Sequence, residues 1–124
     1  MHIVIVGGGG VGYELARNLS DKQQDVVVIE KNELKALRFK EALDVMVIED
    51  DGANAAVLEK ADIKNAGMLI AVTQIDEVNM IACMLAKRYD VPITVCRIRN
   101  TGYCDDCSVL TPKQLGIDIV INPE

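Results

Sequence analysis

Short apolar runs alternate with longer segments of helical spacing along the chain. The short runs are rich in Val, Ile and Leu, which is typical of buried strands, and the longer segments repeat apolar residues every three or four positions. The pattern predicts strands over residues 2–6, 25–30, 45–48, 68–72, 93–98 and 117–121. It predicts helices over residues 11–20, 33–42, 55–61 and 76–88, and a weaker helix between residues 98 and 116.

This alternation is typical of consecutive βαβ units. It predicts an α/β fold of the Rossmann type, with a doubly wound, six-stranded parallel sheet and helices on both faces. Half of the residues are hydrophobic but only 3% are aromatic and none is Trp, so aliphatic side chains must fill the core. Such a composition suits strands that are buried on both sides. We expect residues 1–124 to form a single domain, because the chain shows no linker or repeat.

The charge balance narrows the classes of partner. The chain carries 13 basic and 19 acidic residues, a formal net charge of -6. An acidic surface repels the phosphate backbone, so we expect no nucleic-acid partner. No apolar run approaches the roughly 20 residues that span a bilayer, and no leader pattern precedes the first strand. We therefore expect a cytoplasmic domain, either free or peripheral on the inner face of the cell membrane.

The helix predicted over residues 76–88 is apolar over much of its circumference. One side is formed by Val78, Ile81, Ala82, Leu85 and Ala86, and Met80, Cys83 and Met84 widen it. A helix of this kind is buried on two sides. The pattern predicts that the chain forms a homodimer or a higher oligomer through this helix or one beside it.

A glycine-rich turn separates the first predicted strand from the first helix. Its sequence is Gly7-Gly8-Gly9-Gly10-Val11-Gly12, which contains the G-x-G-x-x-G pattern of dinucleotide-binding folds. Gly7 would allow the tight turn, Gly9 would let the backbone approach a pyrophosphate, and Gly12 would let the helix pack close to the strand. The N–H groups at the start of the helix would then bind phosphate oxygens. A tight packing turn with no ligand is the alternative.

An acidic residue supports the nucleotide hypothesis. Glu30 ends the second predicted strand, at about the 20-residue distance from the turn that the dinucleotide fingerprint requires. A carboxylate there would accept both ribose hydroxyls and favour NAD over NADP. Lys31 follows, and is either a phosphate contact or a solvated surface residue. The predicted ligand is NAD or NADH, and ATP, ADP or AMP would fit the same site because they share the adenosine ribose.

With these residues the sequence resembles the TrkA N-terminal domain, also called the RCK or KTN domain, of potassium-uptake and potassium-channel regulatory subunits. The resemblance covers essentially the whole chain. The most specific stretch is 70–79, in which a strand ending in A-V-T is followed by D-E-x-N at the start of a helix. Further matches lie at residues 5–12, 28–30, 51–52, 97–100 and 115–124.

The resemblance implies roles for individual residues. Gly7 to Gly12 would bind the pyrophosphate, Glu30 the ribose, and Asp51 with Gly52 the adenine side. The far half of the ligand would lie against Thr73 and its neighbours Gln74 and Glu77. Arg97 and Arg99 fit a phosphate contact, because guanidinium groups grip phosphate well, and a salt bridge to an acidic residue is equally compatible with either.

The resemblance also implies a function: a regulatory domain that controls potassium transport by a membrane transporter or channel subunit. Members of the family usually continue into a small C-terminal domain that binds a second ligand, and these 124 residues stop before it. The segment Tyr103-Cys104-Asp105-Asp106-Cys107 departs from the family pattern, which more often has an acidic helix without cysteine there.

Two other functions are weaker alternatives. Cys104 and Cys107 form a C-x-x-C that suits a redox pair or half of a zinc site, but Cys83, Cys96 and His2 do not obviously complete four ligands in one chain. The metal alternative would take the form of a four-thiolate site shared across a dimer. We expect no metal site. A small NAD-dependent oxidoreductase, or a fragment of one, would need a proton-transferring group near the nicotinamide, and we find no candidate catalytic residue.

Overall fold

The computed structural model describes residues 1–100 and 111–122. The elements follow in the order β1 (His2–Val6), α1 (Gly10–Asp21), β2 (Asp25–Ile29), α2 (Glu33–Ala42), β3 (Met46–Ile48), α3 (Ala55–Lys60), the short 3-10 helix η1 (Ile63–Asn65), β4 (Met68–Ala71), α4 (Asp76–Arg88), β5 (Ile93–Arg97) and β6 (Ile119–Ile121). The predicted strands and the four main helices are confirmed to within two residues at each end. Of the weaker helix expected before Gly116, residues 101–110 lie outside the described range, and residues 112–116 form turns.

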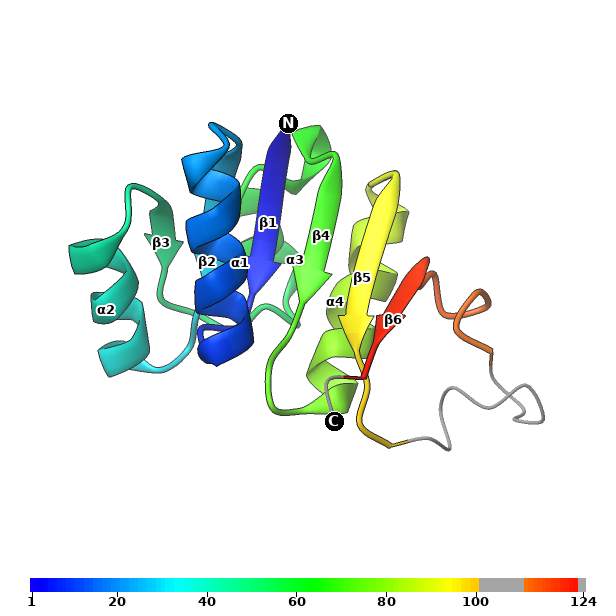
Figure 1. The fold of residues 1–124 in the computed structure, drawn as a ribbon. Helices are drawn as coiled ribbons and strands as arrows, with labels where there is room; N and C mark the ends of the chain where they lie inside the picture. Colours follow the sequence, from blue (N-terminus) through cyan, green and yellow to red (C-terminus); the bar gives the residue numbers. More distant parts are fainter. Residues whose placement is uncertain (101–110, 123–124) are drawn as a thin grey trace.

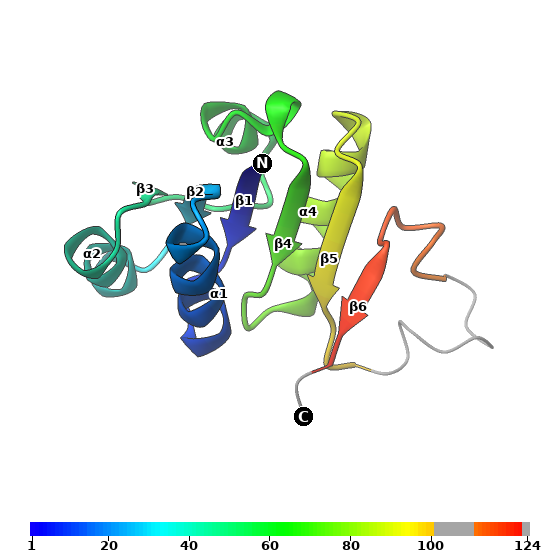
Figure 2. The same cartoon turned by 45° about the horizontal axis from the view of Figure 1, so that its top comes forward.

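The six strands form one parallel sheet in the order β3-β2-β1-β4-β5-β6. Helices α1 and α2 cover one face, and α3 and α4 cover the other (Figure 1). Turning the molecule shows the sheet between these two layers (Figure 2). The predicted doubly wound Rossmann-like fold is confirmed. Because the strand order reverses between β1 and β4, the loops that follow these two strands diverge and open a crevice at their carboxyl ends.

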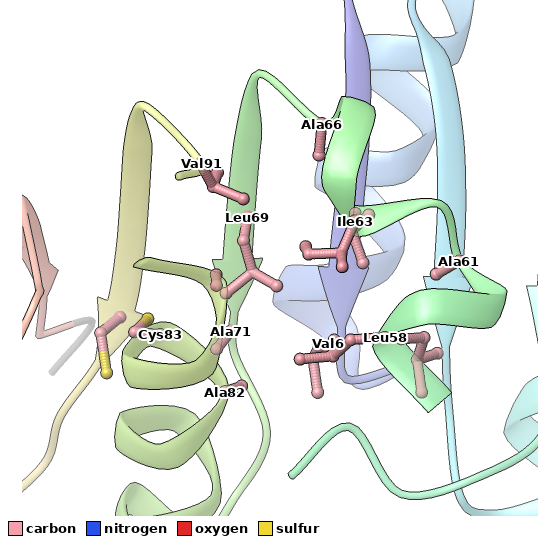
Figure 3. Close-up of a cluster of buried hydrophobic side chains, with 14 of the residues drawn as sticks. Val6, Leu58, Ala61, Ile63, Ala66, Leu69, Ala71, Ala82, Cys83 and Val91 are labelled. Carbon is pink, nitrogen blue, oxygen red and sulfur yellow. The ribbon is translucent and has the colours of Figure 1, made fainter. Parts of the chain in front are cut away.

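A separate apolar core fills each face of the sheet. Successive residues of a strand point to opposite faces, so Val4 and Val6 join the core under α3 and α4 while Ile3 and Ile5 join the core under α1 and α2. Figure 3 shows part of the first core, in which Val6 and Leu69 from the sheet meet Leu58 and Ile63 from α3 and η1. The strands are apolar on both sides for this reason, as the composition predicted.

Helix α4 packs on the sheet through one side and leaves apolar residues of its other side exposed within the single chain. Its buried residues are Asn79, Met80, Ala82, Cys83 and Ala86. Ile81 and Met84, which were expected to be covered, are 41% and 40% exposed. The hydrophobic pattern alone does not place Asn79 inside, because it counts asparagine as a surface residue; hydrogen bonds to Thr73 after β4 and to Arg97 at the end of β5 hold this side chain in the interior.

A polar cluster anchors β6 to the rest of the sheet. Asp118, just before β6, accepts a hydrogen bond through Oδ2 from the Thr94 backbone N–H at 2.8 Å, and the Lys87 Nζ lies 2.6 Å from the same oxygen. The hydrogen bond from Lys87 holds the pKa of Asp118 below its ordinary value, and the bonds from Thr94 act in the same direction. The final strand is therefore joined to both β5 and α4 by one carboxylate.

Candidate nucleotide-binding site

A cleft of about 190 Å³ lies at the carboxyl ends of the central strands. Its walls come from the loops that follow β1, β2, β3 and β4, which are far apart in sequence and adjacent in the sheet. The residues that line it are Val6, Gly7, Gly8, Gly9, Ile29, Glu30, Lys31, Lys35, Asp50, Asp51, Gly52, Val72, Thr73, Gln74, Ile75 and Val78. The cleft thus occupies the topological switch point, where open α/β sheets bind ligands.

The glycine turn presents an uncapped helix end to this cleft. Gly7 has a φ of 115°, a conformation that side chains disfavour. Helix α1 begins after Gly9, which gives it no side-chain cap, and its first turn holds no acidic residue. By contrast, Asn32 caps α2 and Asn54 caps α3. The first N–H groups of α1 therefore have no capping side chain and remain available to an anion.

The glycines of the turn differ in the space around them. A Cβ at Gly9 would have no atom within 4 Å, so it would enter the open cleft. A Cβ at Gly12 would overlap the Gly7 carbonyl oxygen, so only glycine lets α1 approach the turn. A Cβ at Gly8 would lie 2.7 Å from both Glu30 Oε1 and Phe39. Gly8 and Gly12 are required by packing, and Gly9 is not.

Glu30 is held by the backbone on both sides. Its side chain is nearly buried, with 9% of the residue exposed. Oε1 accepts a hydrogen bond from Gly8 N–H at 2.5 Å, and Oε2 accepts one from Asn32 N–H at 2.6 Å. Each carboxylate oxygen can accept a second hydrogen bond, so two acceptor positions remain for the two hydroxyls of a ribose. The sequence did not indicate this bracing, which fixes the carboxylate beside the glycine turn.

The remaining predicted residues lie around the cleft to different degrees. Asp51 and Gly52 line the wall after β3, where Asp51 Oδ1 accepts from Ala53 N–H at 2.9 Å and the absent side chain of Gly52 makes room for Val6. Thr73 and Gln74 line the wall after β4, and Lys31 lies beside Glu30.

The sequence profile of the TrkA-N domain matches residues 3–123. The chain belongs to the TrkA-N domain family. It is 45% identical over 131 aligned positions to the Trk system potassium uptake protein trkA homolog 1 of Methanosarcina mazei, an alignment that covers 100% of the chain and 31% of that protein.

Solved structures share the fold of this TrkA-N domain. The GsuK channel bound to NAD superposes with a TM-score of 0.78 at 21% identity, covering 97% of this chain and 21% of the channel. The Shewanella denitrificans Kef CTD in its AMP-bound form gives a TM-score of 0.76 at 21% identity, covering 98% of this chain and 71% of that one. The domain therefore spans about a third of the Methanosarcina relative and a fifth of the GsuK chain.

Five predicted site residues of the TrkA-N domain do not line the cleft: Gly10, Val11, Gly12, Glu77 and Arg97. Val11 and Gly12 lie within α1, and Gly10 is its exposed first residue. Glu77 is exposed on α4. Arg97 ends β5, and its Nε is buried without a hydrogen-bond partner. Arg99 is exposed beyond β5, and Asp76 accepts from its backbone N–H.

The sequence prediction missed several residues that line the cleft. Lys35 lies in the first turn of α2, and Asp50 precedes Asp51. Ile75 and Val78 add apolar surface from the loop before α4 and from its first turn. The position of Asp50 next to Asp51 was a usable signal. Lys35 belongs to no motif in the sequence, and it reaches the cleft because the first turn of α2 closely follows the carboxyl end of β2.

The cysteines give no support for metal or redox chemistry in the described part of the chain. Cys83 and Cys96 are buried between α4 and β5 and are free thiols. Contact with the Cys96 thiol and burial raise the pKa of Cys83 far above its ordinary value, which keeps it protonated and unreactive. No cluster of three metal-ligating side chains occurs among residues 1–100 and 111–122. Cys104 and Cys107 lie outside the described residues, so the C-x-x-C prediction stays untested.

Within the same described residues, no helix is both long enough and apolar enough to cross a membrane.

Proposed function

We propose that residues 1–124 form one regulatory domain that binds an adenine nucleotide and controls potassium transport by a membrane transporter or channel. The observation that carries this proposal is the pairing, in one cleft, of an uncapped helix N-terminus with a carboxylate whose free acceptor positions suit a ribose. Membership of the TrkA-N family, together with relatives named as Trk potassium uptake proteins, supports the transport role.

The proposed ligand orientation follows from the cleft. The diphosphate lies over Gly7 to Gly12 and the first N–H groups of α1, and the adenosine ribose lies on Glu30. Asp51 and Gly52 flank the adenine, with Lys31 and Lys35 beside it. The far half of a dinucleotide lies against Thr73 and Gln74. NAD or NADH fills this length, whereas AMP, ADP and ATP use the adenosine side alone. The NAD-bound GsuK channel and the AMP-bound Kef domain share the fold and support both classes.

Regulation requires that the ligand binds two states of the domain with different affinity. In our proposal, occupancy of the cleft changes the geometry of the domain and of its self-association, and an associated potassium pore opens or closes in response. The domain then acts at the cytoplasmic face of the membrane as a homodimer or a higher oligomer, and it needs no catalytic residue.

Calorimetry on the purified chain tests nucleotide binding. We expect saturable binding of NADH or NAD and of AMP or ADP at the same site, with each nucleotide displacing the others. Mass spectrometry of ligand that co-purifies identifies the physiological nucleotide. The proposal fails if none of these nucleotides binds.

A turnover assay separates regulation from the alternative function, a small NAD-dependent oxidoreductase. NADH bound to the domain should change in fluorescence and remain unoxidised when carbonyl substrates are added. Steady loss of NADH absorbance with any such substrate would favour the oxidoreductase.

A further inference from the structure

The first turn of α4 holds a side chain, Asn79, that joins the loop after β4 to the end of β5. Asn79 is fully buried, and its amide makes four hydrogen bonds. Oδ1 accepts from the Thr73 backbone N–H at 2.9 Å and from the Thr73 hydroxyl at 2.7 Å. Nδ2 donates to the Thr73 carbonyl at 3.1 Å and to the Arg97 carbonyl at 2.9 Å. All the hydrogen-bonding capacity of the amide is therefore used inside the protein.

The orientation of this amide is fixed by its partners. The Thr73 N–H is only a donor and the Arg97 carbonyl is only an acceptor, so reversing the amide would place donor against donor and acceptor against acceptor. Asn79 thereby holds the backbone N–H, the carbonyl and the hydroxyl of Thr73. Few other side chains present two acceptor and two donor positions in so small a volume.

A second residue of the same helical turn extends the connection. Asp76, the first residue of α4, accepts hydrogen bonds from the backbone N–H groups of Arg99 at 3.0 Å and Asn100 at 2.8 Å. The first turn of α4 thus contacts the loop after β4, which lines the cleft, and the segment after β5, which does not. Of the two residues, Asn79 bonds both Thr73 in the loop after β4 and Arg97, the last residue of β5.

We propose that Asn79 is a positioning residue that fixes the wall of the cleft facing the far half of a dinucleotide and passes its occupancy to the end of β5. The inference rests on the proposed nucleotide function and deepens it. Asn79 does not reach the cleft itself and acts through Thr73. An adenine mononucleotide held only by Glu30 and the glycine turn makes no use of this wall, so dinucleotides and mononucleotides should respond differently to changes at Asn79.

The test compares NADH with AMP on the Asn79→Ala variant by calorimetry. Losing the bonds that hold Thr73 should weaken NADH binding about tenfold. AMP binding should stay within about twofold of wild type. The tenfold loss requires a ligand that contacts the wall held by Asn79, and AMP does not contact it in the proposed orientation. Thr94→Val is the matched control, because Thr94 is also fully buried. Thr94 lies near the start of β5, at the end opposite Arg97, and its hydroxyl donates to the Gly116 carbonyl. It should lower the melting temperature and leave both affinities unchanged.

Amide hydrogen exchange on the wild-type chain provides a readout that needs no variant. Bound NADH should slow exchange at Thr73 and at residues 97–100, and bound AMP should not. Equal effects of NADH and AMP, or an equal loss of both affinities in Asn79→Ala, would overturn the positioning role while leaving nucleotide binding intact. Wild-type protein that binds neither ligand overturns the proposed function, and this inference with it.

Discussion

Gly9 and Gly12 lie three positions apart in one turn and have opposite requirements. The backbone of Gly9 has φ -73°, which any residue adopts, and a Cβ there would enter empty space. Gly12 is pressed against the Gly7 carbonyl. The G-x-G-x-x-G pattern gives both positions the same letter, but in this chain one glycine leaves room for a ligand and the other allows packing.

Gly9→Val should therefore separate binding from stability. We expect a melting temperature close to wild type and a loss of nucleotide affinity of more than about tenfold, because the side chain occupies the ligand's volume. Gly12→Ala is the contrasting variant, and its clash with backbone should cost about 1–3 kcal/mol or more in unfolding free energy. Thermal melts and calorimetry measure both. Unchanged affinity in Gly9→Val would contradict the assignment of the diphosphate to this turn.

Glu30 combines a structural role with its proposed binding role. In Glu30→Gln an NH2 group replaces one carboxylate oxygen and must face the N–H of either Gly8 or Asn32, donor against donor. We expect a loss of about 1–3 kcal/mol in unfolding free energy from the unsatisfied buried donor, together with weaker binding of every adenosine ligand. Urea denaturation and calorimetry measure the two effects. A variant as stable as wild type would show that the carboxylate is not braced as the structure describes.

At the scale of elements, the helices divide by the way they begin. Helices α2 and α3 each start with an asparagine that bonds their first N–H groups, whereas α1 and α4, which start at the cleft, have no side-chain cap. Of these two uncapped helices, α1 has no acidic residue in its first turn, whereas α4 carries Asp76 and Glu77. The proposed anion site therefore falls at α1, because Asp76 and Asn79 in the first turn of α4 are committed to internal hydrogen bonds.

The attachment of β6 should depend on pH. Asp118 has a lowered pKa in the folded chain, so its contribution to stability is present above the ordinary pKa of Asp, about 3.9, and is lost as the pH falls through its lower folded value. At pH 7, Asp118→Asn should lose about 1 kcal/mol or less, since the carboxylate is 43% exposed.

Urea denaturation at pH 7 and at pH 3 or below measures this difference. The gap between wild type and Asp118→Asn should shrink at the lower pH. Asp44→Asn, at an exposed carboxylate distant from Lys87, is the control and should show a small effect at both values. A gap that is the same at both pH values would argue against the Lys87 and Thr94 contacts.

At the scale of the whole molecule, α4 has one side packed on the sheet and one side exposed. Its inner side holds the ends of β4 and β5, and its outer side exposes Ile81 and Met84 beside Leu85 and Leu115, where they line a shallow groove. The sequence predicted self-association from the apolar breadth of this helix, and the structure identifies the residues that remain uncovered. We propose this groove as the contact between copies of the chain.

Ile81→Glu should weaken that contact without unfolding the chain, because the side chain is already 41% exposed. Light scattering at tens of micromolar, roughly the concentration at which weak interfaces form, should give an oligomer for wild type and a monomer for the variant. Leu34→Glu, on the exposed side of α2, is the matched control and should keep the wild-type mass. A wild-type chain that is monomeric at this concentration would contradict the proposal.

The sequence by itself determined the sheet and the location of its cleft. Strands such as Val26 to Ile29 are apolar at every position, which only a sheet covered on both faces accommodates, and the glycine turn with Glu30 lies where consecutive βαβ units place their carboxyl ends. These signals are local, since each is read within one strand or one turn.

Only the tertiary structure decided which residues meet. Gly8 N–H bonds the Glu30 carboxylate, and Asn79 bonds both Thr73 and Arg97. Lys35 lines the cleft beside loops from other strands. Each of these contacts joins residues from separate elements. Periodicity counts a buried asparagine as a surface residue and Ile81 as core, because it contains no information on partners distant in sequence. Strand order and helix orientation supply those partners, and they give this chain its proposed route from the cleft through Asn79 to the end of β5.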